Sequence, residues 1–480
     1  MVSLIKEQLK ERARTLVQLP EHFKPIIEEY FEGENGEGEA IFSWADKQQE
    51  EWISITLDLA GNLTSLSIEL NKTNTGRVPL NESELKERAE QFLRSHYPHA
   101  LQGLTHYHTK KLTAAYRFYY EQIVMDLPLD DAGCYIDVKP SGEIVNFKYY
   151  GLQPAPIIPK TLIAKEKLIE HVRNRLDFQL TIANLYSDIY DVAEDGLRLL
   201  YDPELFMKYK ADVVEPTLTI IHEDEEDNPE TYVSLPPPPT IIRKDVSVEE
   251  IIGITDEMEV IREVDWGEET GIVWRDRDWK MVENDLSMNN LFQNHNEDTV
   301  KAFISKKTGQ VRSFVWIKDR SGDLCLNREE CYQKAIDFLQ MMIPNYYQYL
   351  QLIVHDNDDE LDDTKMKEAF TFHVHNGHGI RIYTEIVVVT VNRKTGQIDY
   401  YSGPSFDYEQ LRHISSEPVI SKKEVHDIFL NHLDFELAWI KNYDEKEEYY
   451  TLVYQACDRH TRKSIRYIDA ITGAVITEKD

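Results

Sequence analysis

The sequence predicts an α+β protein made of two duplicated halves, each a series of modules in which one helix packs on an antiparallel sheet. Two observations support this fold class. A helix-forming stretch at 80–93 returns at 326–339, and a small residue followed by Gly recurs at five places. The repeated motifs keep one order in both halves, while their separation drifts slowly from 246 to 257 positions. A tandem duplication with lengthening loops explains both features.

The two helical stretches begin with the same capping signals. Asn81 and Asn327 can accept hydrogen bonds from the first turn, and Glu84 and Glu330, three positions later, complete a capping box. Apolar residues then recur at helical spacing and predict a buried stripe on each helix, where replacing Phe by Ala should cost about 3–5 kcal/mol. The stripes are Leu85, Ala89, Phe92 and Leu93, and Cys331, Ala335, Phe338 and Leu339.

Single glycines between strand-like segments predict tight β-hairpins, because Gly adopts positive φ without strain. These glycines are Gly61, Gly142, Gly309, Gly396 and Gly473. Side-chain oxygens three or four positions earlier can cap the turns; they belong to Asp58, Ser305, Asn392 and Asp469. Each Gly stands alone and no helix follows it, which argues against a phosphate-binding loop.

Each half is expected to hold three modules, with helices beginning near Ser3, Asn81, Ile163, Ser247, Asn327 and Ser421. The first half spans 1–235, with modules at about 1–77, 78–155 and 160–235. The second half spans 246–480, with modules at about 246–322, 324–405 and 418–480. An acidic run at 222–230 and the prolines at 236–239 replace the Gly turn of the third module, so residues 236–245 are expected to form a proline-rich linker.

The net charge of -33 restricts the possible partners. Such an excess of carboxylates repels phosphate backbones and anionic lipid surfaces, so nucleic-acid binding and docking on a membrane are not expected. A basic partner is compatible with it. The chain has no run of about 18 apolar residues, so membrane insertion is not expected either.

The four cysteines lie at 134, 325, 331 and 457, without the spacing of a disulfide framework or a thiolate zinc site. Under the duplication Cys331 aligns with Leu85 and Cys134 with Val388, so these residues are expected to behave as small apolar side chains. The first ten residues indicate an amphipathic helix rather than a signal peptide. A cytoplasmic location is therefore expected.

The helix, the strands and the closing hairpin with its small-residue-Gly turn together resemble the PepSY module. The tandem arrangement, with Trp-containing strands at 44–46 and 274–276, resembles the YcdB/YcdC repeat family of Firmicutes over nearly the whole chain. This resemblance implies α+β modules and no established activity. PepSY modules are associated with peptidase inhibition and extracytoplasmic roles, from which this chain departs because its start lacks a signal peptide. The family motif contains no catalytic residue to carry over.

A histidine cluster is the sharpest candidate for chemistry. His373 and His375 should share one face of a strand and His378 could join them across a turn, as zinc or copper ligands do. The repeat aligns them with Tyr119 and Glu121 of the first half, so a histidine pair without metal is the expected outcome. The acidic stretch 355–363 has carboxylates enough for calcium, but it lacks the central Gly and terminal Glu of an EF-hand loop.

Repetition without a catalytic motif favours a non-catalytic binding or scaffold protein that engages a protein or peptide. Repeated modules create extended surface, and exposed sheet edges can accept a peptide strand. A peptidase-inhibitor-like or chaperone role, implied by the PepSY resemblance, is one alternative. A metal-dependent enzyme using the His373 cluster is another. No catalytic, cofactor-binding or metal-binding residue is assigned, and no cofactor is expected.

Overall fold

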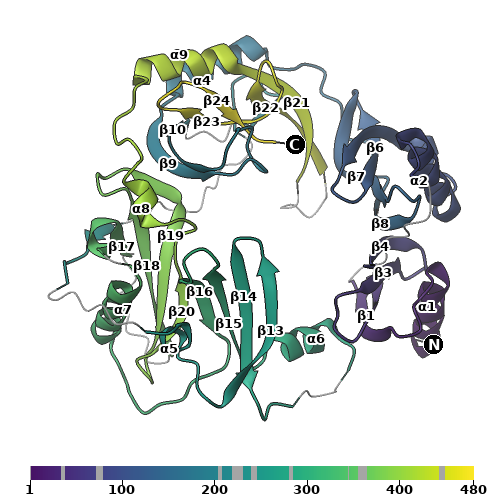
Figure 1. Cartoon of the computed structure of the whole chain (residues 1–480). Helices are drawn as coiled ribbons and strands as arrows, with labels where there is room; N and C mark the ends of the chain where they lie inside the picture. The colour runs from purple at the N-terminus through teal and green to yellow at the C-terminus, as the bar shows by residue number, and fades with distance from the viewer. Residues whose placement is uncertain are drawn as a thin grey trace.

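The computed structural model describes residues 2–33, 38–71, 79–203, 208–218, 231–238, 246–280, 285–343, 345–354, 365–442 and 449–479. Within these ranges the chain forms three units of sheet and helix, which Figure 1 shows arranged in a ring. Two units are large sheets, one from each half. The third, here called the shared unit, combines the last modules of both halves and contains the C-terminus.

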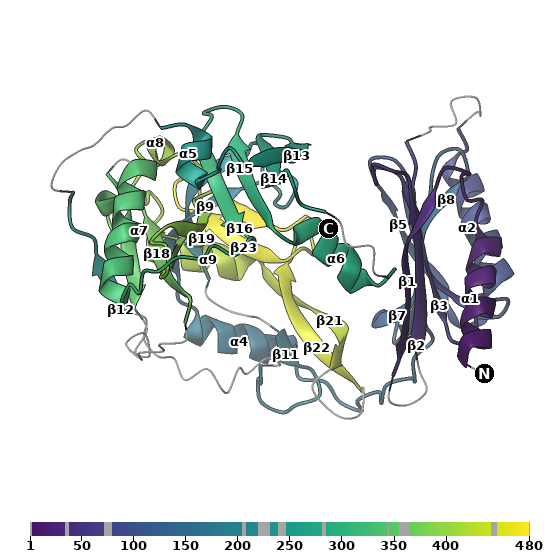
Figure 2. The same ribbon diagram turned by 90° about the horizontal axis from the view of Figure 1, so that it is seen from below.

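The first two modules of the first half share one antiparallel sheet, the first sheet. Its strands lie in the order β1-β2-β3-β4-β8-β7-β6-β5. They are β1 Lys24–Glu32, β2 Gly38–Ala45, β3 Trp52–Asp58, β4 Leu63–Glu69, β5 Thr105–Lys111, β6 Tyr116–Val124, β7 Leu127–Val138 and β8 Ile144–Gly151. Helices α1 (Val2–Leu16) and α2 (Glu82–His96) cover one face, as Figure 2 shows, and the short α3 (Ala100–Gly103) follows α2.

The first two modules of the second half repeat this order in the second sheet as β13-β14-β15-β16-β20-β19-β18-β17, and β12 adds a ninth strand next to β17. Its strands are β12 Thr231–Ser234, β13 Met258–Trp266, β14 Glu269–Asp276, β15 Thr299–Ser305, β16 Val311–Trp316, β17 Leu350–Val354, β18 Lys367–His375, β19 Arg381–Asn392 and β20 Ile398–Ser402. The helical segments are α5 Val248–Ile252, α6 Met288–Asn296, α7 Arg328–Met342, η1 Tyr346–Gln348 and α8 Tyr408–Leu411. The hairpins of Gly142 and Gly396 occupy the same place in the two sheets, so the predicted duplication is confirmed.

The predicted local signals are present. All five turn glycines have φ between 69° and 85°. Asp58 Oδ1 accepts a hydrogen bond from the Asn62 backbone N–H at 2.8 Å, and Asn392 Oδ1 accepts one from the Thr395 N–H at 3.1 Å. Helices α2 and α7 both begin with the expected capping box. These local interactions specify where each strand turns and where each helix starts.

Helices differ between the copies more than strands do. Helix α5, the counterpart of α1, ends after five residues because Gly253 adopts the left-handed conformation at its C-cap. Helix α6 was not among the helices that the sequence predicted. The stripe of α7 is buried throughout, whereas Phe92 of α2 is only half-buried and packs edge-on against Phe147, with ring centroids 5.1 Å apart.

The shared unit is built by strand exchange. The first half supplies α4 Lys165–Arg175, β9 Gln179–Leu185, β10 Gly196–Asp202 and β11 Lys208–Lys210; the second supplies α9 Lys422–His432, β21 Leu433–Asn442, β22 Tyr449–Asp458, β23 Ile465–Asp469 and β24 Val475–Thr477. Strand β10 pairs with β23, which gives one sheet in the order β24-β23-β10-β9, and β22 pairs with β11, which gives a second sheet in the order β11-β22-β21. The exchange is two-fold: the Ala470 N–H donates to the Leu199 carbonyl, and the Ala211 N–H to the Leu452 carbonyl, both at 2.9 Å.

This arrangement corrects the expected domain plan. Residues 160–235 and 418–480 were expected to form one sheet each, but each gives up its last strands to the other. Strand β12, placed by the sequence in the first half, pairs with β17 at the edge of the second sheet. Local sequence patterns do not predict either feature, because strand pairing depends on which sheet edges lie side by side once the chain has folded. The acidic run 222–230 and residues 239–245 of the linker lie outside the described residues.

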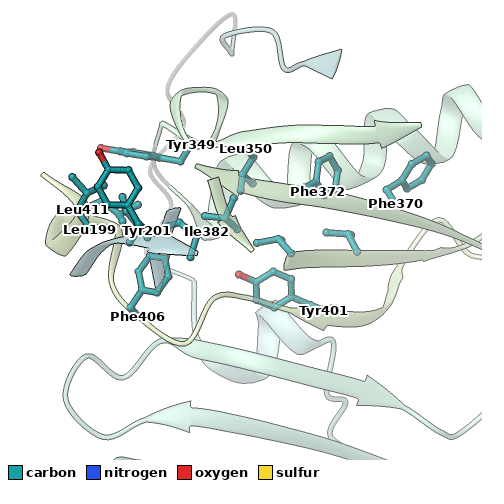
Figure 3. Packing of buried hydrophobic residues seen from close by; sticks show 14 of the residues in the cluster. Leu199, Tyr201, Tyr349, Leu350, Phe370, Phe372, Ile382, Tyr401, Phe406 and Leu411 are labelled. Atoms are coloured by element: carbon teal, nitrogen blue, oxygen red, sulfur yellow. The ribbon is translucent and has the colours of Figure 1, made fainter. Parts of the chain in front are cut away.

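The hydrophobic cores follow these units. The first sheet has its own core beneath α1 and α2. The second sheet and much of the shared unit have one continuous core, part of which Figure 3 shows. There Leu199 and Tyr201 of β10 belong to the same cluster as Ile382 of β19 and Leu411 of α8. The second sheet and the shared unit therefore pack as one body.

The shared unit touches the helix-free faces of both sheets in corresponding ways. Strand β21 packs on β7, and β9 packs on β19. The Trp439 indole N–H donates to the Val124 carbonyl at 3.1 Å in the first contact, and the Thr181 hydroxyl donates to the Arg381 carbonyl at 3.0 Å in the second. Helix α6 closes the ring against β1, where the Glu28 N–H donates to the Leu286 carbonyl at 2.7 Å. No helix in the described ranges is long and apolar enough to cross a membrane.

Candidate functional site

The structure places His373 close enough to His375 to affect its ionisation, and the described part of the chain brings no third His, Cys, Asp or Glu to the pair. His373 is buried (6% exposed), with its ring edge-on to Tyr232 at 5.4 Å and to Tyr383 at 6.1 Å. Burial and the neighbouring His373 lower the pKa of His375. His378 lies exposed on the following turn. Among the described residues, no three His, Cys, Asp or Glu side chains are grouped as a metal would need. The acidic stretch 355–363 lies outside them.

The strand registers correct the alignment of these histidines with the first half. Phe118 faces Ile136 and Phe370 faces Val389, with equivalent hairpins beyond them. The equivalent of His373 is therefore Glu121, two positions from the residue that the sequence pattern selected. The pattern Ala-aromatic-x-Phe occurs in both strands, but a slip of two keeps the same face buried, so the sequence alone could not exclude it.

Glu121 lies in a cleft on the helix-free face of the first sheet, at its junction with β21. The cleft has a volume of about 700 Å³. Its walls come from β5, β6, β7, β8 and β21. Aromatic rings and carboxylates dominate the lining: Tyr107, Tyr119, Tyr135, Tyr150 and Trp439, with Glu121, Asp130, Asp131 and Glu436. Of the described residues that line the cleft, only Arg117 carries a positive charge.

Arg117 is already neutralised by a buried partner. Its Nε and Nη2 donate to the two carboxylate oxygens of Asp137 at 2.6 and 2.7 Å, and Asp137 is 4% exposed. The guanidinium also lies over the Tyr135 ring, 4.1 Å from its centroid. Such a bidentate, stacked pair holds the arginine in place. It therefore supplies no positive charge for the other carboxylates of the cleft.

Glu121 is the carboxylate of the cleft whose ionisation is disfavoured by burial. Burial, reinforced by the charge of Asp130, raises its pKa to about 7. Its Oε2 is buried and receives no hydrogen bond from the described residues. A buried acceptor without a donor is costly, and a ligand that donates to it would relieve that cost.

The cleft extends to β5. Tyr107 of β5 lines the cleft and is 49% exposed. It occupies a bulge, since the register with β6 shifts between His106 and His108. Within the described ranges, β5 is the last strand of the first sheet. The equivalent strand β17 is not the last in its sheet, because β12 pairs along its outer side.

Sequence reasoning missed this site, although a weak signal was present. Along Tyr116–Val124, the residues facing the core alternate with Arg117, Tyr119 and Glu121, a polar and aromatic set on the opposite face. That alternation shows a strand whose second face is not core. Trp439 and Glu436 come from the other half of the chain, and no pattern in the sequence connects them with β6.

Two parts of the chain match one family model. Residues 6–151 and 242–405 each match the YcdB, YcdC repeated domain. The YcdB protein of Bacillus subtilis (strain 168) is 32% identical over 476 residues, covering 98% of this chain and 97% of that protein. The YcdC protein of the same organism is 29% identical over 477 residues, covering 96% and 100%.

Among solved structures, the Bacillus megaterium YpeB C-terminal domain is 18% identical, with a TM-score of 0.24, and covers 48% of this chain and 94% of that chain. The two family matches fall on the two large sheets, and the similarity to YcdB extends over almost the whole chain. This chain belongs to the YcdB/YcdC repeated-domain family.

Proposed function

We propose that the protein is a non-catalytic binding protein that takes an extended segment of a partner protein or peptide as an added strand on β5. One observation supports this function. The chain covers the equivalent edge of its own second sheet with β12, an antiparallel strand in which Tyr232 faces Ile353 and Ser234 faces Gln351. Main-chain hydrogen bonds along a sheet edge supply affinity, and alternate side chains supply specificity.

The segment on β17 also shows what kind of ligand fits. Strand β12 is four residues long and is followed by Leu235 and a run of prolines. Proline ends strand pairing because it has no N–H to donate. An eight-residue probe with the sequence of residues 231–238, Thr-Tyr-Val-Ser-Leu-Pro-Pro-Pro, therefore reproduces the whole element.

The experiment measures amide hydrogen exchange of the full chain with and without this probe. Saturable binding should slow exchange in β5. The variant Tyr107→Pro should abolish the protection, because proline removes a backbone donor at the bulge, where no residue of β6 is paired. Tyr107→Ala, which keeps the N–H, is the matched control for backbone pairing. Protection confined to β17, or none anywhere, would reject β5 as the docking edge.

We infer that the modules are PepSY-like, since each of the first two modules in a half combines a helix with antiparallel strands and a Gly hairpin. Peptidase inhibition or chaperone activity would be forms of the same peptide binding. The cytoplasmic location is proposed as well, and fractionation of the native host tests it.

A further inference from the structure

We propose that the strand accepted by β5 carries a lysine or arginine, which enters the cleft lined by Tyr107 and Tyr119 and pairs with Glu121. This inference rests on the proposed strand addition and names the chemical class of the partner, a basic extended segment. It follows from comparing the two copies of one site, position by position.

The second sheet shows where an added strand places its side chains. Gln351 faces both Ser234 of β12 and His373 of β18, so these three residues share one face. Tyr232, two positions from Ser234, lies on that same face, and its ring meets the His373 ring edge-on. One side chain of the added strand is thus delivered to the ladder position of His373. In the first sheet that position belongs to Glu121.

The charge of the receiving surface is inverted between the copies. Around Tyr232 the second sheet places the His373 ring and the Arg381 guanidinium, which lies 3.9 Å from the Tyr232 ring centroid. The strand register makes Pro128 the equivalent of Arg381, since Arg381 faces His375 and Pro128 faces Ile123. The second sheet thus has the Arg381 cation at this position, and the first sheet has the neutral Pro128, which lines the same cleft as the Glu121 carboxylate. The complementary side chain changes from an aromatic one to a cationic one.

The rest of the cleft favours the same class of side chain. Asp130 adds a second carboxylate close enough to raise the pKa of Glu121, whereas Arg117 is held by Asp137. Tyr107 and Tyr119 line the cleft, one face of the Tyr119 ring being stacked on His108 at 4.1 Å between centroids, and cations bind the uncovered faces of such rings. An ammonium or guanidinium group would donate to Oε2 of Glu121, which has no donor among the described residues.

Two fluorescent probes test the inference on the full chain at pH 8. One is Thr-Tyr-Val-Ser-Leu-Pro-Pro-Pro, and the other replaces its Tyr by Lys. The Lys probe should bind the unmodified chain about tenfold more tightly than the Tyr probe. Glu121→Gln should remove this preference, and Asp130→Asn should reduce it. Glu69→Gln, on an exposed residue of the same sheet, should retain it and controls for net charge.

The outcomes separate the two proposals. If both probes bind β5 with equal affinity, or if Glu121→Gln keeps the preference for Lys, the basic partner is wrong while strand addition stands. If neither probe binds, strand addition itself fails and this inference fails with it. If both probes bind, the Lys probe binds more tightly, and this preference is lost in Glu121→Gln, both proposals are supported.

Discussion

Replacing Glu121 by Gln should make the free energy of unfolding less dependent on pH. Burial raises the pKa of Glu121 to about 7 in the folded chain, from 4.5 when it is solvated. Between these values the unfolded chain has released the proton and the folded chain still holds it. The free energy of unfolding therefore falls as the pH rises through this window, and Gln, which carries no charge, removes that fall.

The magnitude follows from the difference in pKa. One pH unit corresponds to about 1.36 kcal/mol, so the window has a ceiling of about 3.4 kcal/mol. The carboxylate is only partly buried and solvent screens its charge, which reduces the expected value to about 1–2 kcal/mol. At pH 8 Glu121→Gln should be more stable than the unmodified chain by this amount. At pH 4.5 the two should be nearly equal.

Urea unfolding is carried out at both pH values. Hydrogen exchange of β6 and β7 then reports the difference in free energy of unfolding between Glu121→Gln and the unmodified chain at the site. Hydrogen exchange is needed because a chain with several units need not unfold in one step. Glu69→Gln, on an exposed side chain, should change little at either pH. An equal gain for Glu121→Gln at pH 4.5 and pH 8 would refute the reasoning, since a packing effect does not titrate.

Three further predictions follow from buried groups. Phe338→Ala should cost about 3–5 kcal/mol because the ring is 6% exposed, and the half-buried Phe92 should cost less; urea melts showing the reverse order would contradict the assigned stripes. Arg117→Leu should cost about 3–5 kcal/mol by leaving Asp137 charged without a partner, and adding Asp137→Leu should recover most of that loss, as thermal melts of the single and double variants would show. Zinc or copper should not remain at stoichiometric levels after dialysis against a mild chelator; retention that is lost in His375→Ala would overturn this prediction.

The sequence was sufficient for the repeated elements because each carries a local signal. A capping box at Asn81 and a Gly turn at Gly142 need only neighbouring residues, so both were predictable within a residue or two. The recurrence of these signals in both halves, at a nearly constant separation, predicted the duplication. The repeat itself predicted two similar sheets without any knowledge of their strand order.

Long-range pairing was not predictable in this way. The pairing of β10 with β23 joins residues from opposite halves, and nothing near Leu200 indicates Asp469 as its partner. The alignment of His373 failed for a related reason, since a slip of two along a strand preserves every apolar position. The cleft depends on both effects, because Glu121 and Trp439 meet only after the halves have assembled.

Strand exchange in the shared unit makes the two halves dependent on each other during synthesis. Strands β9 and β10 emerge from the ribosome long before β23, so their sheet stays incomplete until almost the last residue has been made. A half expressed alone would expose the outer edge of β10 or β22, and open edges invite pairing with other chains. A second copy of the same half offers a matching strand. A single-half protein would therefore assemble as a dimer, and the fused chain ensures that the required partner is always present at an effective concentration set by its own linker.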